Sequence, residues 1–147
     1  MGFAERRVFG GMKTKILCIC AKGRNRSRYL AGYLRRKGYS TKFGGIDVKD
    51  EEIGTYGEIW KTRPINKKDV DWADVIIVVR KRLAPVLKKK FKIKGKRVIV
   101  LDVTDSKRLA VLEDKSLAEL DYLTFQKKWT RPKLRKAIKE HLPLKKK

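Results

Sequence analysis

Short apolar runs recur along the chain, and segments with helical spacing separate them. The runs cover residues 15–20, 75–79 and 97–101, and a weaker one covers 41–43 before two glycines. Within each run apolar side chains mostly follow one another instead of alternating with polar ones, which is typical of strands buried on both faces. The pattern therefore predicts four strands of a parallel sheet.

Helical spacing fills the segments between these strands. Leu30, Ala31 and Leu34 share one face of a helix predicted over residues 27–37, and Gly38 is suited to ending it. Further helices are predicted over residues 81–91, 110–123 and 131–141, together with a short one within residues 49–61. Because strands alternate with helices, we predict an α/β fold, a three-layer sandwich with a central four-stranded parallel sheet.

The length of the chain fits one domain. Its 147 residues, of which 41% are hydrophobic, are enough to build a core of ordinary size. Residues 1–11 lack clear periodicity, so we expect an N-terminal extension there and a single domain over residues 12–147. No run approaches the roughly 18 apolar residues of a membrane span, and the first residues lack the apolar segment of a secretory signal. We therefore expect a cytoplasmic protein.

The net charge bears on what the protein can bind. The chain carries 40 Lys and Arg against 16 Asp and Glu, a formal net charge of +24. Such an excess attracts polyanions, so nucleic acid is a candidate partner through the basic surface. The share of charged residues, 38%, is also typical of proteins from heat-loving organisms. Thermal adaptation accounts for the density of charge but not for its imbalance.

One segment between the first strand and the first helix combines residues suited to phosphate chemistry. It runs through Cys20, Ala21, Lys22, Gly23, Arg24, Asn25, Arg26 and Ser27. A cysteine at the end of a parallel strand lies at the sheet edge where open α/β folds bind ligands. The next helix points its N-terminus at the same spot, and with the loop amides it favours an anion or a thiolate. Cys20 is therefore the candidate nucleophile, Arg26 the clamp on phosphate oxygens, and Ser27 a donor to the thiolate.

The spacing Cys-x5-Arg, followed by Ser27 and placed on the first strand, resembles the low-molecular-weight protein tyrosine phosphatase family. Residues 44–46 resemble the family's turn after a strand and residues 71–78 its third strand, so the similarity covers roughly residues 13–105. The resemblance implies a low-molecular-weight-phosphatase-like fold and a cysteine-dependent phosphatase that needs no cofactor. The implied substrate is a phosphorylated protein, above all phosphotyrosine, or a small phosphomonoester.

The family mechanism also implies a general acid, an aspartate on the loop beyond the fourth strand that precedes proline. No Asp-Pro pair occurs here, and both Asp102 and Asp105 follow that strand. We favour Asp105 because it lies further into the loop, and Asp102 is the second candidate. The phosphate loop departs from the family at Lys22 and Gly23, where the family carries Gly and Asn. Gly23 can still adopt the positive φ that Asn would take there.

Two other functions compete with the phosphatase hypothesis. A non-catalytic module can use the same loop to bind nucleic acid or a phosphorylated partner, with the basic surface supplying affinity. An arsenate reductase of the same fold needs resolving cysteines beyond the nucleophile, and only Cys18 is available. Because Cys18 and Cys20 stand close together on one strand, we expect free thiols and a buried Cys18. One histidine and no Cys/His cluster predict no metal site, and the sequence indicates no oligomeric state.

Overall fold

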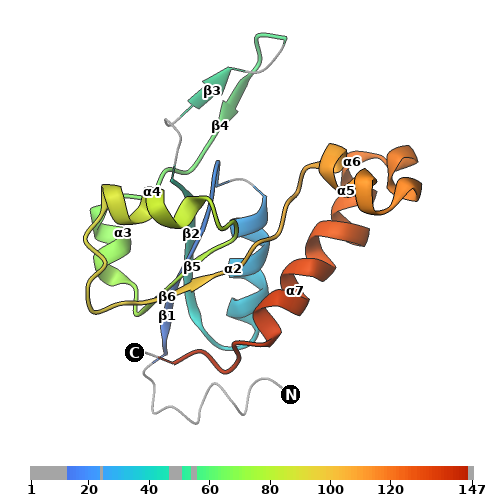
Figure 1. Ribbon diagram of the computed structural model, residues 1–147. Coiled ribbons are helices and arrows are strands. Elements are labelled where there is room, and N and C mark those ends of the chain that lie inside the picture. Colours follow the sequence, from blue (N-terminus) through green and yellow to red (C-terminus); the bar gives the residue numbers. More distant parts are fainter. Residues whose placement is uncertain (1–12, 24, 47–50, 54–55, 146–147) are drawn as a thin grey trace.

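A four-stranded sheet forms the centre of the molecule in a computed structural model, which describes residues 13–23, 25–46, 51–53 and 56–145 (Figure 1). The strands are β1 (Lys15–Cys20), β2 (Ser40–Gly45), β5 (Val75–Val78) and β6 (Arg97–Val100). Their order is β2-β1-β5-β6, and each neighbouring pair is parallel. The predicted four-stranded parallel sheet is therefore confirmed. The predicted extension, residues 1–11, lies outside the described residues.

Helices cover both faces of this sheet, as a three-layer sandwich requires (Figure 1). On one face lie α2 (Arg26–Arg36) and α7 (Arg131–Lys139), and on the other lie α3 (Lys67–Trp72) and α4 (Leu83–Lys90). Successive residues of β1 point to opposite faces. Cys18 therefore packs in the cluster that contains Leu34 and Ile138, whereas Leu17 packs in the cluster that contains Leu87. This double burial explains the continuous apolar runs. None of the described helices is long and apolar enough to cross a membrane.

The segment after β6 folds into a small lobe instead of the single helix predicted over residues 110–123. Its elements are α5 (Lys107–Glu113), η1 (Lys115–Glu119), α6 (Tyr122–Phe125) and the π-helical turn η2 (Gln126–Thr130). The prediction is wrong because the side chains of Ser106, Asp114 and Asp121 each accept a hydrogen bond from a backbone amide and begin a new turn. The lobe has its own small core of Ala110, Leu117, Phe125 and Trp129.

The short helix predicted within residues 49–61 is also wrong, because the described part of this segment is an antiparallel hairpin. Strands β3 (Glu51–Ile53) and β4 (Ile59–Lys61) pair with Ile53 opposite Ile59. β-Branched residues favour strands, and Gly57 supplies a positive φ of 79° between them. Helix α3 was not predicted, although Asn66 and Asp69 begin it with a reciprocal capping box.

The contact between α7 and the sheet can be tested at Ile138, whose side chain is fully buried. We expect Ile138→Ala to lower the free energy of unfolding by about 2–5 kcal/mol in urea denaturation, because the truncation leaves a cavity. Leu112→Ala is the control, since Leu112 is 80% exposed, and it should change this free energy by less than about 0.5 kcal/mol. Equal losses in the two variants would contradict the packing described here.

Candidate active site

A cleft of about 1120 Å³ lies at the carboxyl ends of the parallel strands. β1 lies between β2 and β5, so Cys20 at its end is placed near the middle of this edge. The cleft is lined by Cys20, Lys22, Gly23, Asn25, Arg26 and Asp105, among others. Residues from the β1–α2 loop and from the segment after β6 therefore share one space.

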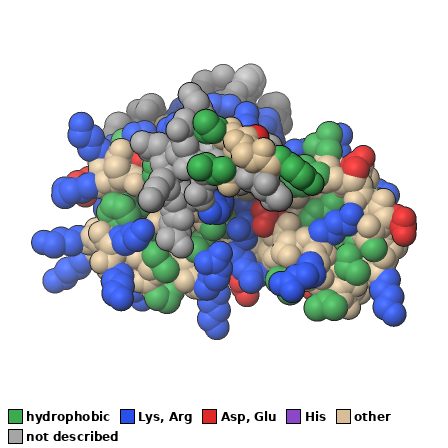
Figure 2. Space-filling view, turned by 90° about the horizontal axis from the view of Figure 1, so that it is seen from above, with side chains coloured by type: hydrophobic (Ala, Val, Ile, Leu, Met, Phe, Trp, Pro, Cys, Tyr) green, Lys and Arg blue, Asp and Glu red, His purple; other side chains and the backbone are tan. Residues whose placement is uncertain are grey.

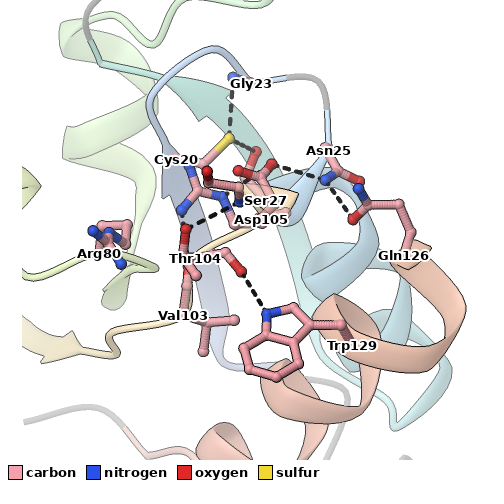
Figure 3. Close-up of polar contacts among 12 residues, drawn as sticks. Cys20, Gly23, Asn25, Ser27, Arg80, Val103, Thr104, Asp105, Gln126 and Trp129 are labelled. Carbon is pink, nitrogen blue, oxygen red and sulfur yellow. Dashed lines mark hydrogen bonds and ion pairs between the residues drawn. The ribbon is translucent and has the colours of Figure 1, made fainter. Parts of the chain in front are cut away.

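The thiol of Cys20 is held by two polar contacts (Figure 3). The amide of Gly23 donates a hydrogen bond to Cys20 Sγ at 3.1 Å. Ser27 Oγ also lies 3.1 Å from Cys20 Sγ, and either atom can be the donor of that bond. Ser27 is fully buried and Cys20 is 3% exposed. Both partners can donate to a thiolate, so the loop is built to hold a sulfur anion.

Gly23 has a φ of 70°, which confirms the positive φ expected at this position. A Cβ atom there would lie 2.6 Å from both Arg63 O and Gly45 N. The loop therefore lies against the backbone at the end of β2, and only glycine fits both the dihedral angle and the space. This close approach fixes the amide that contacts Cys20.

Helix α2 begins in a way that suits an anion. Its N-cap residue, Asn25, makes no side-chain capping bond, and its first turn contains no acidic residue. The first hydrogen bond of the helix runs from Tyr29 N to Asn25 O. The amides before Tyr29 therefore have no acceptor within the helix. Arg26 and Arg28 add positive charge at an end that already carries the positive pole of the helix dipole. A bound anion at this end would relieve that repulsion.

Arg26 joins the loop to the segment after β6. Its Nη1 donates a hydrogen bond to Val103 O at 2.8 Å, and its Nε lies 3.4 Å from Asp105 Oδ2. The residue is 7% exposed, and Nε has no hydrogen-bond acceptor within the described part of the chain. A guanidinium has five N–H donors. One of them is used by Val103 O, and donors remain for an anion in the cleft that Arg26 lines.

The two candidate acids lie in different surroundings. Asp105 lines the cleft, its side chain is 32% exposed, and its Oδ2 accepts a hydrogen bond from Asn25 Nδ2 at 2.9 Å. Asp102 accepts a bond from Lys81 N at 3.2 Å and lies 3.7 Å from Arg80 Nε. Its side chain is 59% exposed and is not among the described residues that line the cleft. Asp105, but not Asp102, therefore shares the space of Cys20 and Arg26.

The remaining predicted loop residues have different positions. Lys22 and Gly23 line the cleft, and Ala21 packs partly buried against the core on the α3 and α4 face. Arg24, also predicted for the phosphate loop, lies outside the described residues. Asn25, predicted only as a loop residue, also contacts Asp105 and Gln126.

Sequence reasoning missed several residues of the cleft. Arg28, Phe43, Thr62, Arg63 and Tyr122 also line it. Arg63 is held at the rim, because its Nε donates to Phe43 O at 2.9 Å and its guanidinium lies 5.0 Å from the centre of the Phe43 ring. Apart from Arg28, which lies in the first turn of α2, these residues are distant in sequence from the segment of residues 20–27 and share no spacing with it, so no local signal identifies them.

Cys18 is a free, fully buried thiol on the face of β1 that α2 covers. Burial raises the pKa of this thiol, and the neighbouring Cys20 raises it further. Cys18 is therefore held as a neutral core side chain, as the sequence predicted.

No protein-family model matches this chain, and no curated protein matches it. Solved structures do resemble it. Primo-1 is 16% identical, with a TM-score of 0.52 over 89% of this chain and 99% of that one. A YwlE mutant from Bacillus subtilis is 12% identical, with a TM-score of 0.51 over 87% of this chain and 95% of that one. These two likenesses support the low-molecular-weight-phosphatase-like fold.

A third similar structure is the YwlE arginine phosphatase from Geobacillus stearothermophilus. It is 17% identical, with a TM-score of 0.49 over 86% of this chain and 88% of that one. At such identities the likeness concerns the fold alone.

The two cysteines should differ in their reaction with iodoacetate. We expect the native protein to be alkylated at Cys20, which lines the cleft, and to remain unmodified at Cys18. Raising the pH through the ordinary thiol range should not make Cys18 reactive, because its raised pKa keeps the thiol protonated. Peptide mass spectrometry after quenching measures both sites. The Cys20→Ser variant is the control and should take up no label while folded, whereas rapid labelling of Cys18 would contradict the burial described.

Proposed function

We propose that this protein is a cysteine-dependent phosphatase that hydrolyses phosphomonoesters. The observation that carries the proposal is the position of Cys20 Sγ in the cleft, 3.1 Å from Gly23 N and from Ser27 Oγ. Arg26 and Asp105 line the same cleft. The residues proposed as nucleophile, phosphate clamp and proton donor therefore lie in one cleft.

In the first chemical step the thiolate of Cys20 attacks phosphorus in line with the leaving oxygen. The S–P bond forms while the P–O bond to the leaving group breaks, and the proton of Asp105 moves to the leaving oxygen. The guanidinium of Arg26 and the amides at the start of α2 hold the equatorial phosphate oxygens, where negative charge concentrates.

In the second step water replaces the sulfur. Asp105, now ionised, takes a proton from water as the water oxygen attacks phosphorus. The P–S bond breaks, Cys20 leaves as a thiolate, and inorganic phosphate is released. Contacts from Gly23 N and Ser27 Oγ stabilise the departing thiolate as they do the attacking one.

We propose Asp105 as the general acid because it lies beside Asn25 and Arg26 in the cleft. Asp102 instead contacts the backbone of Lys81 and the side chain of Arg80. It serves better as a structural partner for the start of α4 than as a proton donor. The proposal thus keeps Asp105 and sets Asp102 aside.

The substrate proposed is a protein phosphomonoester, with phosphotyrosine as its first candidate. The cleft exceeds the roughly 300–1,000 Å³ of common small-molecule pockets, and aromatic residues Phe43 and Tyr122 line it. Lys22, Arg28 and Arg63 add positive charge, and Asp105 is the one carboxylate among the described lining residues. Figure 2, which looks down on this edge, shows many Lys and Arg side chains and few Asp and Glu. Acidic sequence around the phosphate group would complement this surface.

The competing function is a phosphate-binding module without turnover. Such a module needs the loop, Arg26 and the basic surface, but it has no use for a held thiol beside a carboxylate. Cys20 and Asp105 are the two lining residues that favour an enzyme. Binding that falls steeply with salt, in the absence of turnover, would instead favour the module and its nucleic-acid or phosphoprotein partners.

Turnover of p-nitrophenyl phosphate in EDTA tests the proposal. We expect the unmodified chain to hydrolyse it, and Cys20→Ser to lower kcat by at least about 1000-fold, because serine is a far weaker nucleophile at neutral pH. Cys18→Ser is the matched control and should retain turnover. An unmodified chain that binds phosphate but shows no turnover would overturn the enzyme proposal.

The assignment of the acid is tested by a matched pair of substitutions. We expect Asp105→Asn to lower kcat for phenyl phosphate by about 100-fold or more, because an amide cannot donate the proton to the leaving oxygen. Asp102→Asn should leave kcat within about twofold, since exposed polar contacts contribute little. Steady-state kinetics on both variants decides the matter. A large loss only in Asp102→Asn would reverse the assignment.

The cationic rim is tested with peptide substrates. We expect Arg63→Gln to raise KM about twofold to fivefold for a phosphotyrosine peptide flanked by glutamates, and to leave KM for p-nitrophenyl phosphate nearly unchanged. Lys139→Gln removes the same charge outside the described lining of the cleft and should leave both KM values unchanged. The difference between peptides should shrink in high salt. Equal effects of the two substitutions would show that only net charge matters.

A further inference from the structure

One amide group connects Asp105 with the small lobe after β6, residues 107–130, which we call the C-terminal lobe (Figure 3). Asn25 Nδ2 donates a hydrogen bond to Asp105 Oδ2 at 2.9 Å and a second one to Gln126 Oε1 at 2.9 Å. The NH₂ group has two hydrogens, so both are used. Because an ionised carboxylate only accepts, Asn25 must turn Nδ2 toward Asp105. Gln126 then turns its oxygen toward Nδ2. By accepting the second hydrogen, Gln126 Oε1 helps to hold the Asn25 amide in this orientation.

Gln126 occupies a costly position. It begins the π-helical turn η2, and it is 1% exposed. Its Nε2 is buried with no hydrogen-bond partner among the residues that the structure describes. A buried, half-satisfied amide is unfavourable for folding, so stability does not explain a glutamine here. π-Helical turns occur frequently at functional sites.

The side chain of Asn25 does not cap its helix. It stands at the N-cap of α2, where asparagine usually accepts a hydrogen bond from the first turn of the helix. No such bond is made, and the side chain is directed to Asp105 and Gln126 instead. Two residues thus depart from their stabilising uses, and both departures converge on Asp105.

The backbone that carries Asp105 is held on both sides as well. Arg26 Nη1 donates to Val103 O at 2.8 Å, and Trp129 Nε1 donates to Thr104 O at 3.2 Å. Trp129 belongs to the same π-helical turn as Gln126. The turn therefore contacts the Asp105 segment directly through Thr104 and indirectly through Asn25.

We propose that Gln126 and Asn25 are positioning residues for the general acid, and that they select which carboxylate oxygen carries the proton. Asn25 Nδ2 and Arg26 Nε both face Oδ2 of Asp105. Oδ2 stays an acceptor, and Oδ1 carries the proton that passes to the leaving oxygen and later receives the proton from water. This inference rests on the proposed phosphatase function.

The leaving-group dependence of kcat/KM, which reports the first chemical step, separates this role from a structural one. A poor leaving group such as phenolate needs protonation, whereas 2,4-dinitrophenolate departs without it. We expect Gln126→Met and Asn25→Ala each to lower kcat/KM for phenyl phosphate about tenfold, and to change kcat/KM for 2,4-dinitrophenyl phosphate less than about twofold, because kcat/KM does not include the later attack of water. Methionine matches the volume of glutamine and removes its hydrogen bond.

Thr130→Val is the matched control, because Thr130 lies in the same turn, is also 1% exposed and also has a buried oxygen without a described partner. It should leave kcat/KM for both esters unchanged. The double variant Asn25→Ala/Gln126→Met should lose no more activity than either single variant, because the two residues act in series. Asn25→Ala alone keeps the test decisive if Gln126→Met fails to fold.

Equal losses on both esters, or additive losses in the double variant, would overturn the positioning role while leaving the phosphatase intact. The proposed function fails in a different way: the unmodified chain would then hydrolyse neither ester, and the positioning proposal would fall with it.

Discussion

A buried guanidinium, that of Arg26, holds together the two halves of the cleft. It sits at the start of α2, yet it reaches across to Val103 O and to Asp105 on the segment after β6. A buried cation is stable only with partners that offset its lost hydration. The carbonyl and the carboxylate therefore have to approach the β1–α2 loop. This requirement brings the proposed acid into the cleft that the proposed nucleophile lines.

The C-terminal lobe also holds the segment after β6, through contacts to Thr104 and Asn25. It follows β6 and packs its own small core of Ala110, Leu117, Phe125 and Trp129. From this platform Trp129 binds the backbone at Thr104 and Gln126 binds Asn25. The segment that carries the proposed acid has no regular secondary structure of its own, so its geometry depends on contacts from both sides. A lobe built on capped short turns supplies one of those sides, and the rigid sheet edge supplies the other.

Local patterns predicted the parts of the fold where burial is uniform. The runs at β1 and β5 are buried on both faces because helices cover both faces, so their sequence alone identifies them as central strands. The errors fall where capping residues interrupt helical spacing, as at Asp114 and Asp121, or where Gly57 reverses the chain. In these places a few side-chain hydrogen bonds and one positive φ outweigh the average preference of a window of residues.

The sequence by itself determined the strand, loop and helix that carry Cys20, Gly23, Arg26 and Ser27, because these residues interact within one short segment. It reduced the candidate acid to Asp102 and Asp105, and favoured Asp105 because it lies further into the loop after the strand. Only the tertiary structure placed Asp105 in the cleft and Asp102 beside Arg80. It alone brought Gln126 to Asn25, 101 residues away along the chain. Hydrogen bonds between distant segments leave no periodic trace in a sequence, since they depend on how layers pack rather than on neighbouring residues.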